Sequence, residues 1–109
     1  MIAPLVAAVI GTVIVAGTAS HVGTGYGARY LALPEGPGHH VRVCGNGGCI
    51  EAVSNDAGPD LAMQRQGRVV DLSAQLFEQV CGCDASTGLT RVTVEYLEDV
   101  ALPATDTIR

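Results

Sequence analysis

Two carboxylates, Asp56 and Asp71, are the side chains in this sequence whose surroundings best suit acid chemistry. Asp71 follows two β-branched valines, which favour extended backbone, and precedes Ser73, a good helix N-cap, by two residues. Asp56 lies in the turn-forming stretch 54–59, Ser-Asn-Asp-Ala-Gly-Pro. A carboxyl group that burial or a second carboxylate keeps protonated can donate a proton. The competing interpretation is structural: Asp71 complements a helix dipole, and both groups accept hydrogen bonds from turn amides.

Four cysteines form two close pairs in the sequence. Cys44 and Cys49 flank the turn 45–48, Gly-Asn-Gly-Gly, and are expected to face each other across a hairpin. Four cysteines in an exported chain indicate two disulfides, and Cys44–Cys49 is the pair that we favour. A bond between Cys81 and Cys83 would close a tight, strained ring, so cross pairing stays open. Four free thiols or a zinc site would also use these cysteines, although their spacings miss the two-residue gap common in zinc sites.

The elements that position these residues are predicted to be short strands and one helix. The 14 glycines and 5 prolines favour many turns over a helical bundle. Apolar residues recur at helical spacing after Asp71 and predict one short helix over about 72–81, which Gly82 ends. The segment 91–96 alternates and predicts a strand with Val92, Val94 and Tyr96 facing inward.

The ends of the chain differ from its middle in composition. Residues 1–19 carry no charged side chain and are dense in Val, Ile, Leu and Ala, which predicts a secretory signal or membrane anchor. The alternative is a buried strand or helix of the domain itself, because short apolar runs are often core. We therefore expect a domain over residues 20–98 and a C-terminal tail over 99–109.

The composition limits the partners of the chain. Its formal charge is −5 and it contains no Lys, which excludes nucleic acid or anionic lipid as the main partner, since both need a basic surface. Membrane contact is expected only through residues 1–19. With 109 residues, no Trp and one Phe, the chain is one domain whose core must come from Val, Leu, Ile and Ala. A monomer without a cofactor or metal is expected.

The order of these segments resembles the double-psi β-barrel domain of the rare lipoprotein A family and its expansin-like relatives. The words that carry the resemblance are Asn-Asp-Ala-Gly-Pro at 55–59 and Val-Asp-Leu-Ser at 70–73, followed by the helix and the last strand. The resemblance extends over roughly residues 17–97. It implies a mainly β fold, a small six-stranded double-psi β-barrel with one short helix, in a protein that is secreted or associated with the cell envelope.

The resemblance also implies roles for individual residues. Lytic enzymes of this family cleave peptidoglycan strands without water, and Asp56 takes the position of their acid. Asp71 matches the acid that expansin-like proteins need to loosen walls without hydrolysis. Further groove residues are expected to bind the substrate: Tyr26, Tyr30, Asn55 and Arg68. The sequence departs from the family in two places, because Ala57 replaces the usual Arg and Tyr30 stands where the lytic enzymes have a His.

Three hypotheses follow from the sequence. The first is an exported barrel that binds, loosens or cleaves peptidoglycan or a related cell-wall polysaccharide; if it is an enzyme, it is expected to be a lytic transglycosylase. The second is a barrel that has kept its structure and lost its chemistry. The third is a small disulfide-stabilised secreted binding protein, such as an inhibitor, unrelated to glycans.

Overall fold

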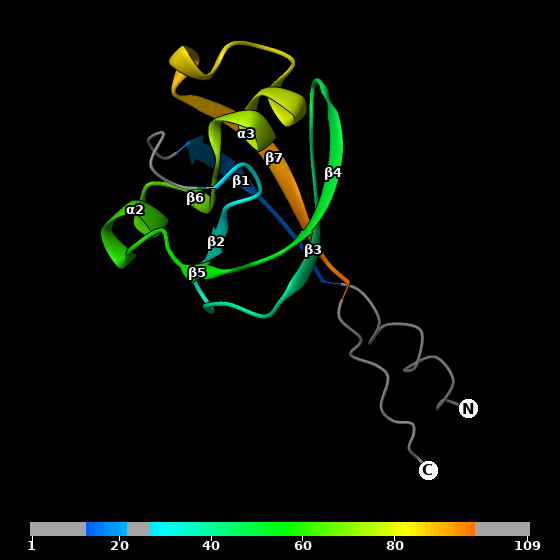
Figure 1. Cartoon of the computed structure of the whole chain (residues 1–109). Helices are drawn as coiled ribbons and strands as arrows, with labels where there is room; N and C mark the ends of the chain where they lie inside the picture. Colours follow the sequence, from blue (N-terminus) through cyan, green and yellow to red (C-terminus); the bar gives the residue numbers. More distant parts are fainter. Residues whose placement is uncertain (1–12, 22–26, 98–109) are drawn as a thin grey trace, which may run out of the picture.

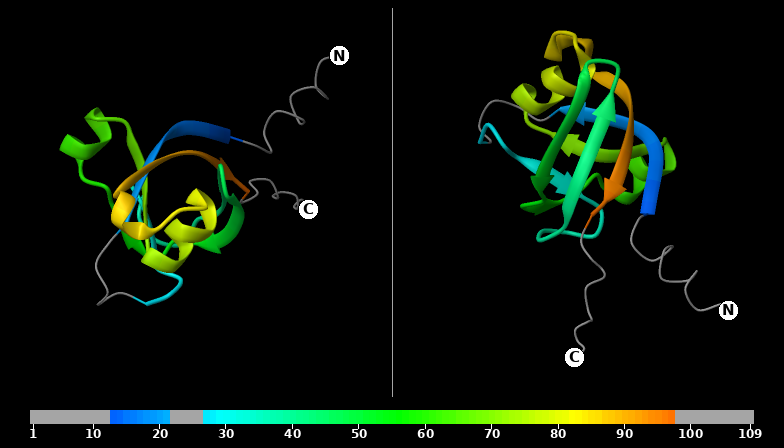
Figure 2. Two further views of the ribbon diagram at one scale, coloured as in Figure 1. Left: turned by 90° about the horizontal axis from the view of Figure 1, so that it is seen from above. Right: turned by 90° about the vertical axis from the view of Figure 1, so that its right-hand side faces the viewer.

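The computed structural model describes residues 13–21 and 27–97, which form one curled sheet with short helices against it (Figure 1). The sheet has seven strands in the order β4-β3-β7-β1-β6-β2-β5. The strands are β1 Val13–His21, β2 Leu31–Leu33, β3 His40–Gly45, β4 Gly48–Val53, β5 Asp56–Ala57, β6 Arg68–Leu72 and β7 Leu89–Tyr96. Views at right angles show the sheet wrapping around an interior (Figure 2).

The mainly β prediction is confirmed, and the details differ from it. The described residues contain seven strands, where six were expected, and three short helical segments, where one was expected. The helical segments are α2 Leu61–Arg65, α3 Ala74–Cys81 and the 3₁₀ turn η1 Ala85–Thr87. None of these helices has the length and hydropathy needed to span a bilayer.

Helix α3 is the helix that the sequence predicted. The Ser73 hydroxyl accepts a hydrogen bond from the Leu76 N–H at 3.2 Å, and Gly82 ends the helix in the left-handed conformation at φ 69°. The apolar face of α3 packs into the open side of the curled sheet, chiefly against β4 (Figure 1). The core is aliphatic apart from Phe77, as the composition required. Its largest fully buried side chains are Phe77, Leu31, Leu33, Leu72 and Leu76.

Strand β1 occupies the middle of the sheet. It pairs with β7 in antiparallel fashion from Val13 to Ser20 and with β6 in parallel from Thr18 onward. The predicted leader, residues 1–19, therefore overlaps the first strand over residues 13–19. The leader stays a prediction for residues 1–12, which lie outside the described part, as does the predicted tail.

Helix α2 was missed by the sequence analysis, which expected a polar connection there. Asp60 caps the helix, because its Oδ1 accepts from the Met63 N–H at 2.9 Å. The helix has five residues and buries none of them, so it shows no apolar periodicity. The available signal was Asp60 directly after Pro59, a cap position following a turn.

The β3–β4 hairpin carries the predicted disulfide. Cys44 and Cys49 are directly opposite each other in the ladder and are bonded, and the second bond joins Cys81 to Cys83. Cross pairing, free thiols and a zinc site are therefore wrong, since none of these cysteines is free. The hairpin tip also caps α3, because the Gly47 N–H donates to the Val80 carbonyl at 2.8 Å.

Candidate functional site

Both predicted acids belong to one row of residues that crosses four strands. In the strand register, Ser20 of β1 pairs with Asp71 of β6, Asp71 with Ala32 of β2, and Ala32 with Asp56 of β5. Directly paired residues in a sheet project to the same side. The neighbours of Ala32 along β2, Leu31 and Leu33, belong to the core cluster, whereas Ala32 does not. The row therefore lies on the side of the sheet away from the core cluster, although Ala32 itself is fully buried there.

Asp71 is held by a neighbour that the sequence analysis did not single out. The Ser20 hydroxyl donates to Asp71 Oδ1 at 2.6 Å, a short, charge-assisted hydrogen bond. Within the described residues, Asp71 Oδ2 receives no hydrogen bond. Gly58 lies against it: a Cβ on Gly58 would be 3.2 Å from Asp71 Oδ2 and 3.6 Å from Ala32 Cβ. Asp71 is thus half-buried beside a turn, with one oxygen that no described residue donates to.

Asp56 is exposed and held in its ionised form. The Tyr30 hydroxyl donates to Asp56 Oδ2 at 2.8 Å, and the Ala57 N–H donates to Asp56 Oδ1 at 2.8 Å. Both hydrogen bonds favour the carboxylate, so they lower the pKa of Asp56 below its ordinary value, with Tyr30 the larger cause. Tyr30, which stands where the lytic enzymes have a His, is therefore a partner of the acid.

The two carboxylates lie on strands that are not neighbours in the sheet. They lie on β5 and β6 with β2 between them, and neighbouring strands are about 4.8 Å apart, so the two Cα atoms are about 10 Å apart. A carboxylate pair that shares one proton needs contact at about 3 Å. The row therefore offers two independent hydrogen-bond acceptors.

Two polar residues fix the loops around the row. Buried Ser73 donates to the Ala28 carbonyl at 2.6 Å, which ties the start of α3 to the segment before β2. The Asn55 side-chain oxygen accepts from the Leu31 N–H at 3.1 Å, and its backbone N–H donates to the Leu31 carbonyl at 2.9 Å. Asn55, predicted to bind substrate, thus extends the pairing of β5 with β2 and positions Asp56.

The remaining predicted site residues lie elsewhere. Tyr26 is outside the described residues. Arg68 donates to the Met63 sulfur at 2.9 Å and lines a pocket of about 250 Å³ together with Glu35, Gln64 and Tyr96. Neither Asp56 nor Asp71 lines that pocket. Among residues 13–21 and 27–97, no group of three or more His, Cys, Asp or Glu side chains is arranged to hold a metal ion.

Ser20 is the site residue that sequence reasoning missed. It is 51 residues from Asp71, and only the parallel pairing of β1 with β6 brings them together. A parallel pair needs a long crossover connection, so no local pattern near Ser20 indicates its partner.

Comparison with known proteins supports the fold. No protein-family model matches the sequence, and no curated protein matches it. The structure is similar to a point mutant of Clavibacter michiganensis expansin in complex with cellohexaose, with TM-score 0.61 and 21% identity over 84% of this chain. The apo form of that expansin gives TM-score 0.60 and 22% identity over the same share. The chain spans 54% of these expansin chains. The likeness confirms the expansin-like double-psi barrel fold.

Proposed function

We propose that this domain binds a cell-wall polysaccharide, peptidoglycan being the first polymer to test, and holds or loosens it without cleaving it. The main observation behind the proposal is that hydrogen bonds favour the ionised form of Asp56. A proton donor to a glycosidic oxygen needs a pKa raised toward the working pH, whereas Tyr30 and the Ala57 N–H lower the pKa of Asp56. An ionised carboxylate is instead a strong acceptor for sugar hydroxyls.

Asp71 supplies the second acceptor in this proposal. Ser20 occupies its Oδ1, which orients the carboxylate and leaves Oδ2 for a hydroxyl of the bound polymer. The two acceptors about 10 Å apart then contact separate parts of an extended chain. The likeness to an expansin crystallised with cellohexaose supports a polysaccharide as the ligand. Two disulfides support secretion, because such bonds persist in oxidising compartments.

The test combines binding and product analysis on purified peptidoglycan and on cellulose. Asp71→Asn removes the charge and keeps the shape, and a hydrogen bond to a charged group contributes about 1.5–3 kcal/mol. We expect the variant to sediment with the polymer about tenfold more weakly than the wild type, with no soluble products from either protein.

Asp60→Asn is the matched control. It makes the same change of charge at an exposed helix cap, and Asn caps helices as well as Asp does. Asp60→Asn should therefore bind as the wild type does. Equal binding of Asp71→Asn and the wild type would contradict the proposal. Anhydro-muramyl products that appear with the wild type and vanish with Asp56→Asn would instead establish a lytic transglycosylase.

A further inference from the structure

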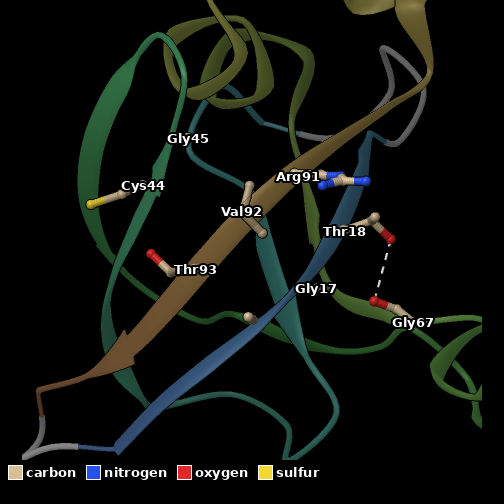
Figure 3. Close-up of a pocket in the computed structure, with 9 residues that line it drawn as sticks. Gly17, Thr18, Cys44, Gly45, Gly67, Arg91, Val92 and Thr93 are labelled. Atoms are coloured by element: carbon tan, nitrogen blue, oxygen red, sulfur yellow. Dashed lines mark hydrogen bonds between the residues drawn. The ribbon is translucent and has the colours of Figure 1, made fainter.

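A shallow pocket lies on the same side of the sheet as the row formed by Ser20, Asp71, Ala32 and Asp56. Strand alternation places Ala16 and Thr18 of β1 on the same side as Ser20, and their register partners Thr93 and Arg91 of β7 lie beside them. These four residues line a shallow pocket of about 560 Å³, which Figure 3 shows from outside the sheet. The pocket begins two residues along β1 from Ser20, so it adjoins the acidic row.

The walls of this pocket are small. Ala16, Thr18 and Thr93 are short side chains, and the rest of the lining includes Gly17 of the same strand and glycines from two other segments. The Thr18 hydroxyl donates to the Gly67 carbonyl at 3.3 Å (Figure 3). The Thr93 hydroxyl makes no hydrogen bond to the described residues. The lining is therefore shallow and mostly apolar, with the Thr93 hydroxyl available at its edge. Such a surface suits a sugar ring.

Arg91 is the charged group of the pocket, and the described residues give it no partner. Its guanidinium makes no ion pair and no hydrogen bond with them, although it can donate five. Arg42 differs: on the same side of the sheet it is bound by Glu51 at 2.8 Å and by Glu95 at 3.0 Å. Glu95, the one acidic residue on β7, is therefore already paired with Arg42. Arg91 is exposed, and a guanidinium without a partner among the described residues has all its donors available for an anion.

We propose that this pocket is a subsite for the free carboxylate of an acidic polysaccharide, with Arg91 as its partner. The proposal rests on the proposed function and narrows its substrate class from any cell-wall glycan to one that carries free carboxylates. The acidic row and the Arg91 pocket would then bind different groups of the polysaccharide. Asp71 and Asp56 accept from hydroxyls and repel an acidic group, whereas Arg91 attracts it. A bound chain has its carboxylate at the β1–β7 end.

The test uses two ligands that share one sugar backbone and differ in whether its carboxyl groups are charged or methyl-esterified. Oligogalacturonate carries one carboxylate per unit, and its fully methyl-esterified form carries none. For the wild type we expect about tenfold tighter binding of the acid form, measured by isothermal titration calorimetry at low salt, and a smaller preference as salt rises. Arg91→Gln should bind both forms equally. Arg65→Gln loses the same charge at an exposed position on α2 and should keep the preference.

The outcomes separate this inference from the proposed function. A wild type without preference for the acid form, or an Arg91→Gln variant that keeps it, overturns the inference. If the ester form or cellohexaose still binds and Asp71→Asn weakens that binding, the proposed function survives such a result. If the wild type binds none of the three ligands, the inference fails, and the sedimentation test on peptidoglycan then decides the proposed function. Circular dichroism of each variant confirms that the fold is retained.

Discussion

At the scale of single residues, the contact between Tyr30 and Asp56 is the observation on which the proposed function depends. The Tyr30 hydroxyl donates to Asp56, the residue that the resemblance assigned to proton donation, and lowers the pKa of that carboxyl group. The position of Tyr30 in the sequence showed only that a His was missing. Its contact with Asp56 depends on the parallel pairing of β2 with β5, which sequence patterns did not reveal.

Removing the Tyr30 hydroxyl should raise the pKa of Asp56. A carboxyl whose folded pKa is depressed contributes stability above its unfolded pKa and loses it as pH falls through the folded pKa. Tyr30→Phe should therefore move the NMR titration of Asp56 to higher pH and reduce the loss of stability in that acidic window. Tyr96→Phe is the control, since its hydroxyl donates to Glu35 instead. An unchanged Asp56 titration in Tyr30→Phe would contradict this assignment.

At the scale of elements, the sequence predicted what short-range patterns encode. Ser73 and Gly82 bound α3, the alternation of 91–96 gave β7, and the turn 45–48 gave the hairpin with its disulfide. Helix α2 and the pairing of Ser20 with Asp71 were not predictable in the same way. The helix has no buried face, and the pairing joins residues far apart in the chain.

The contact between the hairpin tip and α3 should tolerate no side chain at Gly47. A Cβ there would lie 2.6 Å from the Gly82 Cα and closer still to the Gly82 nitrogen, so backbone must move. We expect Gly47→Ala to lose about 1–3 kcal/mol of unfolding free energy, the usual range for overpacking, measured by thermal denaturation. Gly27→Ala is the matched control, because its Cβ would meet no atom within 4 Å. Equal melting temperatures for the two variants would contradict this prediction, because they would show that the backbone at Gly47 and Gly82 moves apart at little cost.

At the scale of the whole molecule, the two disulfides are local and lie close together. Both disulfides lie where the β3–β4 hairpin meets the end of α3, and each closes a short stretch of chain. The chain-entropy model gives about 2 kcal/mol for the Cys44–Cys49 loop. We expect the Cys44→Ser, Cys49→Ser double variant to lose about that much stability in urea titration.

Trypsin tests the pairing directly. It cuts after arginine, so Cys44 and Cys49 fall together in the peptide 43–65, and Cys81 and Cys83 in the peptide 69–91. Digestion without reductant should release these two peptides separately by mass spectrometry. A single species that contains both peptides would show cross pairing and contradict the structure.

The antiparallel pairing of β1 with β7 has a consequence for how this domain can be carried. Val13 and Tyr96 are ladder partners, so the chain enters and leaves the barrel at one place. Ser20 and Leu89 are partners at the far end of the same two strands, seven residues from Val13 along β1, or about 23 Å. A loop of a host protein could therefore accept the whole domain as an insertion, and the barrel could be circularly permuted, without the linkers crossing the acidic row.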